Sequence, residues 1–222
     1  RETLAPFASA AAAGVLTGVS RETLTSALGA AYAFCSGANR GMTTGSWDIV
    51  LPAGQGARAG LLSLDLARAG FRAVEEPLVG RAGLYPLYFR DSFREGVLLA
   101  GLGREFEGSN ATVKIYASCL FTHAPVAALI RLCRREGLSP DDIASMRVRL
   151  SAYAAQLVAL AGGETGLAAP RDVFAAQNSL PFCLALAAHT GHLFLDDFTK
   201  SALEDRAILD LARRIRMVVQ ES

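Results

Sequence analysis

The sequence has few of the features that mark several large classes of protein. It contains only two lysines, Lys114 and Lys200, and its 22 basic and 21 acidic residues leave a formal net charge of +1. No run of basic residues exceeds two, so the sequence shows neither a nucleic-acid footprint nor a patch for an anionic membrane. The longest uncharged stretches, residues 4–20 and 23–39, are too short and too rich in small and polar residues to span a bilayer. We therefore expect no nucleic-acid partner and no membrane partner.

Paired cysteines and short catalytic motifs are also missing. The four cysteines, Cys35, Cys119, Cys133 and Cys183, stand singly and form no C-x-x-C pair. This pattern favours neither a zinc site nor a disulfide framework, and it predicts a reducing, cytoplasmic location. The glycine motifs that cradle phosphates and the Gly-x-Ser-x-Gly nucleophile elbow are absent from the sequence.

The composition that remains is that of a folded protein. Of the 222 residues, 51% are hydrophobic and 19% are charged, and the mean hydropathy is +0.29. Such a chain has too much apolar surface to stay disordered, and it is long enough for one large or two small domains. Because it starts at Arg1 without methionine and ends on a strand-like segment, we expect it to be an internal piece of a longer protein.

The first half of the chain has a helical pattern. From Ala5 onward, apolar residues recur at helical spacing, and Ser20 is a candidate N-cap for a helix over residues 21–33. Glycines and a proline predict a loop over residues 35–56, and a leucine-rich and alanine-rich run predicts a buried helix over residues 57–69.

The second half of the chain contains both helical and strand-like patterns. Ser139 and the Pro-Asp-Asp that follows it mark the start of a short helix. Longer helices are expected at residues 125–135, 175–188 and 203–213, and extended segments at residues 113–116, 146–150 and 215–219. The sequence thus predicts a mainly α fold, with an all-helical domain over residues 1–110 followed by a smaller α+β domain over residues 111–222.

One segment concentrates chemically useful side chains. Lys114 lies four residues before Ser118 and nine before His123, and Tyr116 and Cys119 lie between them. A lysine ammonium suits a substrate carboxylate, and an imidazole exchanges protons near neutral pH. Lys114 and His123 are therefore the candidate catalytic residues, and Tyr116, Ser118 and Cys119 are candidate substrate-binding residues. The alternative is that Lys114 is a surface charge at a strand edge and that His123 is a helix residue bonded to nearby backbone.

Three other features allow two interpretations each. Trp47, beside Asp48 in the glycine-rich stretch, is a further substrate-binding candidate, although a single loop tryptophan commonly anchors packing. The aromatic residues between 85 and 93 suggest packing more than ligand binding. His189 and His192 lie three residues apart, but they lack a third metal ligand, which favours a solvated helix end.

Four stretches of the sequence, in this order, resemble the MmgE/PrpD family. They are residues 6–28; residues 53–60 leading to 67–71; residues 114–123; and residues 176–182 leading to 195–198. The family includes 2-methylcitrate dehydratases, cis-aconitate decarboxylases and an iminodisuccinate epimerase.

The resemblance implies a subunit with a large helical domain that forms a homodimer and a smaller α+β lid, with the active site between them. It implies cofactor-free and metal-free lyase or isomerase chemistry on a small di- or tricarboxylate. The reaction would begin by proton abstraction next to a carboxylate, with dehydration or decarboxylation to follow. Lys114 would supply positive charge, and His123 would assist in binding or orienting the acid.

The chain departs from the family pattern at three positions. Ile49 and Pro52 align with a lysine and a histidine of many members, and Leu120 stands where many members have arginine. These changes leave a second interpretation open, in which the protein is a non-catalytic homologue that serves as a scaffold or as one subunit of a split enzyme. A third interpretation is a helical ligand-binding protein unrelated to the family.

Overall fold

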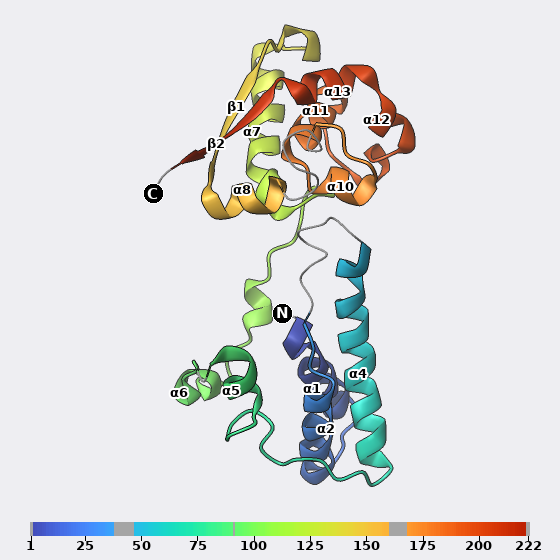
Figure 1. The fold of residues 1–222 in the computed structure, drawn as a ribbon, viewed down its shortest axis with the longest axis vertical. Coiled ribbons are helices and arrows are strands. Elements are labelled where there is room, and N and C mark those ends of the chain that lie inside the picture. Colours follow the sequence, from blue (N-terminus) through green and yellow to red (C-terminus); the bar gives the residue numbers. More distant parts are fainter. Residues whose placement is uncertain (1, 38–46, 91, 160–167, 221–222) are drawn as a thin grey trace. The chain divides into compact units, whose positions relative to one another are not determined.

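The chain folds into two compact units. The computed structural model describes residues 2–37, 47–90, 92–159 and 168–220. The first unit holds the described residues of Arg1–Asn39 and Asp48–Ala111, and the second holds those of Arg40–Trp47 and Thr112–Ser222. Each unit has its own arrangement of elements (Figure 1). Within the described residues, no helix combines the length and the apolar character that a membrane span requires.

Three helices form the centre of the first unit. Helices α1 (Ala5–Leu16), α2 (Arg21–Ala33) and α4 (Leu51–Arg68) pack side by side (Figure 1). The Ser20 hydroxyl accepts a hydrogen bond from the Thr23 N–H at 3.2 Å, which confirms the predicted N-cap of α2. The other described elements in this part of the chain are three 3-10 turns and two short helices: η1 (Glu2–Leu4), η2 (Trp47–Val50), α5 (Leu84–Phe89), α6 (Glu95–Leu99) and η3 (Glu107–Asn110).

The predicted loop over residues 35–56 is wrong from Trp47 onward, because η2 and the first turns of α4 occupy that part. Pro52 lies in the first turn of α4, where a missing N–H breaks no intrahelical hydrogen bond. Gly56 is retained inside the helix for a packing reason, since a side chain there would collide with Ala5 of α1. Residues 38–46 of the predicted loop lie outside the described residues.

Small residues allow α1 and α4 to approach closely. The core of this unit consists of Ala10, Ala27, Ala31, Leu64 and Ala67. A Cβ atom placed on Gly60 would lie 2.6 Å from the Ala10 nitrogen and 2.6 Å from the Pro6 carbonyl oxygen. Since both of these are backbone atoms of a helix, they cannot move aside cheaply.

The second unit is built around α11 (Leu180–Thr190), whose residues 180–187 are all buried. Helices α7 (Leu120–Glu136) and α13 (Arg206–Arg213) pack against it. Strands β1 (Met146–Ser151) and β2 (Ile215–Gln220) form a parallel pair in which Met146 is opposite Ile215. The remaining elements are η4 (Pro140–Asp142), α8 (Ala152–Ala159), α10 (Val173–Gln177), η5 (Leu195–Asp197) and α12 (Lys200–Glu204).

The mainly helical fold class with a small sheet is confirmed, as are the two strands in the last third of the chain. Four local predictions need correction. Residues 113–116 form no strand, α7 begins earlier than residue 125, and Ser139 starts only a 3-10 turn. The helices expected at 175–188 and 203–213 are each interrupted, at Asn178 and at Asp205, because Ser179 and Asp205 each cap the helix that follows them.

The close contact between α1 and α4 predicts a cost for any side chain at Gly60. Gly60→Ala is expected to lower the free energy of unfolding by about 1–3 kcal/mol, because the added methyl overpacks the helix interface. The measurement is urea denaturation followed by circular dichroism.

Gly54→Ala in the same helix is the matched control. A Cβ atom there meets nothing within 4 Å, so alanine should keep or raise the stability through its helix propensity. Equal stability of the Gly60→Ala and Gly54→Ala variants would contradict the proposed packing.

Candidate active site

The segment from Lys114 to His123 leads into the start of α7 and lies within the second unit. Two backbone hydrogen bonds hold it in place. The Ala117 N–H donates to the Leu193 carbonyl oxygen at 3.3 Å, and the Cys119 N–H donates to the Gln177 carbonyl oxygen at 2.8 Å. The segment is therefore fixed to the chain before and after the buried helix α11.

Lys114 is exposed, yet its side chain has a defined partner. Its Nζ donates to the Ser118 carbonyl oxygen at 3.1 Å, one residue before the N-cap Cys119 of α7. The ammonium is thereby held near the start of a 17-residue helix, whose own dipole is positive at this end. Among the residues that the structure describes, no side chain caps this helix start. Lysine and helix together make this end of the second unit electropositive.

A chain of hydroxyl groups lies under the start of α7. The Thr122 hydroxyl donates to the Cys119 carbonyl oxygen at 2.8 Å, and the Ser118 and Thr122 oxygens are 2.6 Å apart. Because a threonine hydroxyl carries one hydrogen, already directed at Cys119, Ser118 must be the donor to Thr122. These hydrogen bonds fix the turn that contains the Ser118 carbonyl oxygen, which accepts the hydrogen bond from Lys114.

Cys183 of α11 lies beside the same hydroxyl groups. Its thiol donates to the Ala176 carbonyl oxygen at 3.3 Å. Burial, and secondarily the neighbouring Cys119, strongly raise the pKa of the Cys183 thiol, and the hydroxyls of Ser118 and Thr122 oppose this only in part. Cys183 is therefore a neutral packing residue and not a nucleophile near neutral pH.

His123 lies in the first two turns of α7 and is 9% exposed. Its ring meets the edge of the Tyr116 ring, with 5.3 Å between the ring centres and an angle of 82° between the planes. Its Nε2 atom is buried and has no hydrogen-bond partner among the described residues. A buried imidazole nitrogen without a hydrogen bond lowers the stability of the fold, so its presence here calls for an explanation.

The structure joins the predicted site residues in two pairs, Lys114 with the Ser118 carbonyl oxygen and the Tyr116 ring with the His123 ring. Cys119 contacts the Gln177 carbonyl oxygen, which lies outside the predicted set. The side chain of Trp47 lies outside the described residues, so its predicted role stays a prediction. Lys114 is exposed, as the alternative for it required, but it lies at no strand edge.

The three departures from the family pattern have different settings. Leu120, in the first turn of α7, is 44% exposed and places no charge there. Pro52 lines a hollow of about 510 Å³ in the first unit, together with Asp48 and Gln55. The side chain of Ile49 lies outside the described residues.

The two histidines near the end of α11 each have a hydrogen-bond partner of their own. Nδ1 of His189 is 2.8 Å from the Ala185 carbonyl oxygen, and Nδ1 of His192 is 2.8 Å from the Asp197 carboxylate. In the part of the chain that the structure describes, no three His, Cys, Asp or Glu side chains are arranged to hold a metal ion.

Thr122 and Cys183 were not among the predicted site residues. Thr122 lies inside the predicted segment, but nothing in its spacing distinguishes it from other threonines. Cys183 is more than sixty positions away in the sequence, and only the packing of α7 on α11 brings it to Ser118. Neither contact has a local sequence signal.

Comparison with known proteins settles the ancestry of the chain. Residues 2–95 match the MmgE/PrpD N-terminal domain, and residues 116–222 match the MmgE/PrpD C-terminal domain. The chain belongs to the MmgE/PrpD family. Its predicted family resemblance is therefore confirmed, and the segment from Tyr116 to His123 lies at the start of the matched C-terminal domain.

Two curated members of the MmgE/PrpD family are similar over most of the chain. Both are cis-aconitate decarboxylases of Aspergillus terreus, one of them from strain NIH 2624, and each is 28% identical over 221 residues. The alignments cover 94% of this chain and 44% of each relative. The chain thus spans less than half the length of these relatives.

The hydroxyl network predicts a specific effect at Thr122. Thr122→Val keeps the shape of the side chain but leaves the Ser118 hydroxyl without its acceptor, so the free energy of unfolding should fall by about 1–3 kcal/mol. Thr122→Ser, which keeps the hydroxyl, is the control and should recover much of the loss. Urea denaturation measures both, and a valine variant as stable as the parent protein would contradict the network.

The cysteines should differ in reactivity. Burial raises the pKa of Cys35 to about 11 and that of Cys183 further, so at pH 8 both remain protonated thiols, whereas alkylation requires the thiolate. Cys119 and Cys133 are only half-buried. Iodoacetamide at pH 8 should label Cys119 and Cys133 first, as read by peptide mass spectrometry. The unfolded chain, in which all four should react alike, is the control, and labelling of native Cys183 as fast as Cys119 would contradict the burial.

Proposed function

We propose that this MmgE/PrpD protein is a lyase or isomerase that acts on a small di- or tricarboxylate by removing a proton next to a carboxylate. The observation that carries the proposal is the fixed ammonium of Lys114 at the uncapped start of α7. The curated relatives, whose names describe the decarboxylation of cis-aconitate, support the same class of substrate.

The start of α7 offers the groups that a carboxylate needs. Backbone N–H groups in the first turn of a helix have no acceptor four residues before them in the helix. In α7 the N–H groups of Cys119 and Thr122 already donate to the carbonyl oxygens of Gln177 and Cys119, and no side chain among the described residues caps this helix. The N–H groups of Leu120 and Phe121 are therefore the donors proposed to face the substrate. Together with the Lys114 ammonium, these donors bind a carboxylate by charge and by hydrogen bonds. Since Leu120 adds no cation, we infer that one carboxylate of the substrate is held here.

The same charge assists the chemical step. When a proton leaves the carbon next to a carboxylate, the electron pair of the C–H bond moves onto the carboxylate oxygens. A fixed cation within contact of those oxygens stabilises the developing charge more than it stabilises the ground state. Loss of hydroxide from the adjacent carbon gives dehydration, and return of the proton to the other face gives epimerisation. In decarboxylation the bond between the carbon and a carboxylate breaks instead, CO2 leaves, and the electron pair left on the carbon takes up a proton.

We propose that His123 orients the substrate or transfers a proton during the reaction. Its buried Nε2 lacks a partner among the described residues, and the edge of Tyr116 restrains its ring. The imidazole is proposed to orient a substrate oxygen or to pass a proton to or from the substrate. Tyr116, Ser118 and Cys119 are proposed as the substrate-binding surroundings, as is Trp47. We further propose a cytoplasmic homodimer formed through the helical unit, which needs no metal or organic cofactor.

A second candidate function is that of a non-catalytic homologue, either a scaffold or one subunit of a split enzyme. It is favoured by Pro52 and Leu120, which carry no acid, base or cation at positions where many family members have one. Co-purification with a second chain that supplies the missing groups, together with inactivity of this protein alone, would support that function.

The two lysines of the chain provide a matched test of the enzymatic proposal. The complete protein is assayed for dehydration and decarboxylation of cis-aconitate, citrate and 2-methylcitrate. In Lys114→Ala, kcat/KM should fall by roughly 100-fold or more, because the charge that stabilises the transition state is lost. Lys200→Ala should leave it unchanged, since Lys200 is exposed and pairs only loosely with Glu204 at 3.9 Å.

The proposed role of Lys114 fails if Lys114→Ala retains the full kcat/KM. Inactivity of the complete parent protein on every acid tested, with its fold intact by circular dichroism, would instead favour the non-catalytic candidate.

A further inference from the structure

The first unit contains two adjacent cavities that the proposed function does not use. One, of about 540 Å³, is lined by Tyr85, Ser92, Phe93, Arg94, Val97 and Leu98. The other, of about 300 Å³, lies between the first two helices and the segment after α4. Phe93 and Leu98 line both cavities, so the two are neighbours that share a wall.

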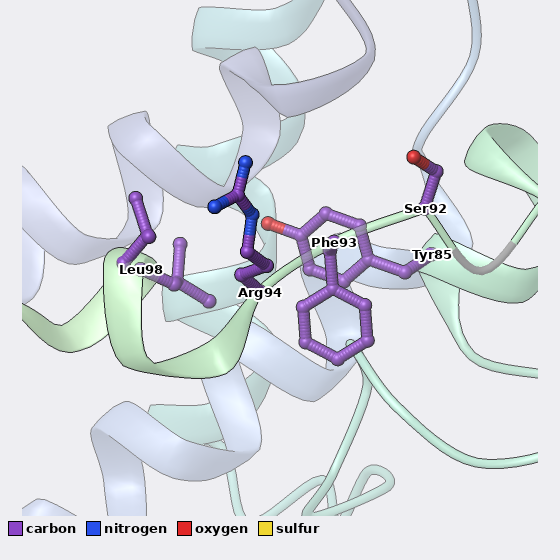
Figure 2. Close-up of a pocket in the computed structure, with 6 residues that line it drawn as sticks. Tyr85, Ser92, Phe93, Arg94 and Leu98 are labelled. Carbon is purple, nitrogen blue, oxygen red and sulfur yellow. The ribbon is translucent and has the colours of Figure 1, made fainter.

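The larger cavity gathers polar groups around an aromatic stack. The rings of Tyr85 and Phe93 are stacked, with 4.2 Å between their centres and 9° between their planes. Figure 2 shows the Tyr85 hydroxyl directed toward the Arg94 side chain. Arg94 makes no ion pair with any side chain that the structure describes. A guanidinium and a phenol on one cavity wall are donors suited to an anion.

The smaller cavity has an apolar wall and acidic residues among its lining. Its apolar lining comes from α1, α2 and the segments at 77–79 and 93–99: Phe7, Leu28, Pro77, Leu78, Val79, Phe93, Leu98 and Leu99. Glu75 and Glu76 also line it. These carboxylates disfavour an anion in this cavity, and the apolar wall favours a hydrocarbon group.

We propose that these two cavities form one binding site for a monocarboxylate with an aliphatic chain. The carboxylate lies in the larger cavity against Arg94 and the Tyr85 hydroxyl. The chain passes Phe93 and Leu98 into the smaller cavity. The charges set the orientation of the bound ligand. Arg94 lines the larger cavity and attracts the carboxylate, whereas Glu75 and Glu76 line the smaller cavity and repel it.

This site shares no residue with the Lys114 segment, since all its lining residues belong to the first unit and Lys114 belongs to the second. It also selects a different ligand. A di- or tricarboxylate has no apolar part to fill the smaller cavity, whereas a fatty acid of medium length has both the single charge and the chain.

The experiment measures binding of octanoate to the complete protein by isothermal titration calorimetry, without any turnover. Affinity is expected to rise about three- to fourfold for each added methylene from butanoate to octanoate. Arg94→Met should weaken octanoate binding at least tenfold, because it removes the cation but keeps an unbranched side chain. Leu98→Glu should do the same by placing a negative charge between the cavities.

Three controls show whether octanoate binds at these two cavities and by its carboxylate. Arg72→Met removes an exposed arginine of the same unit that lines neither cavity, and it should bind octanoate as the parent does. Octylamine, with the same chain and the opposite charge, should not bind at this site. Lys114→Ala should leave octanoate binding unchanged, even though it abolishes the proposed activity.

Several outcomes would overturn the proposal. These are no saturable binding of octanoate, equal binding to Arg94→Met, equal binding of octylamine, or affinity that does not depend on chain length. Loss of octanoate binding in Lys114→Ala would place the carboxylate at the start of α7 and would also overturn it. Because the readout is binding, an inactive protein affects only the proposed reaction and not this test.

Discussion

The hydrogen bond from the Cys119 N–H to the Gln177 carbonyl oxygen is the contact on which the candidate site depends. It joins the start of α7 to the last residue of α10, just before α11, whose residues 180–187 are all buried. The hydroxyl groups of Ser118 and Thr122 then fix the turn that accepts the Lys114 ammonium. The exposed Lys114 therefore has a defined position, because the turn that accepts its hydrogen bond is fixed to the buried part of the unit.

Local signals in the sequence predicted much of the secondary structure. The serine that caps α2 acts through its own side chain and its nearest neighbours, so a single sequence contains the information. The alternation in β1 was equally readable, but its parallel pairing with β2 depends on residues far along the chain. The start of α4 was predicted as a loop, because a proline and glycines usually indicate a loop. The packing of α4 on α1, which makes glycine necessary there, is not visible in the sequence.

The sequence predicted which segment forms the candidate site, but not the contacts that its side chains make. The residue types between Lys114 and His123 indicated acid and base chemistry, and the family resemblance pointed to the same stretch. The contact of Cys183 with the Ser118 hydroxyl and the unsatisfied nitrogen of His123 arise from tertiary packing, which no spacing encodes. The sequence shows at positions 52 and 120 that groups common in the family are replaced, but it does not show what their surroundings became.

The parallel pairing of β1 and β2 has a consequence for how the protein is made. Most of the helices of the second unit, including α11, lie in the connection between the two strands. On a ribosome, β1 therefore emerges long before its partner, and its pairing edge must wait while the intervening helices assemble. During that interval the arginines that alternate along β1 discourage association with strands of other nascent chains.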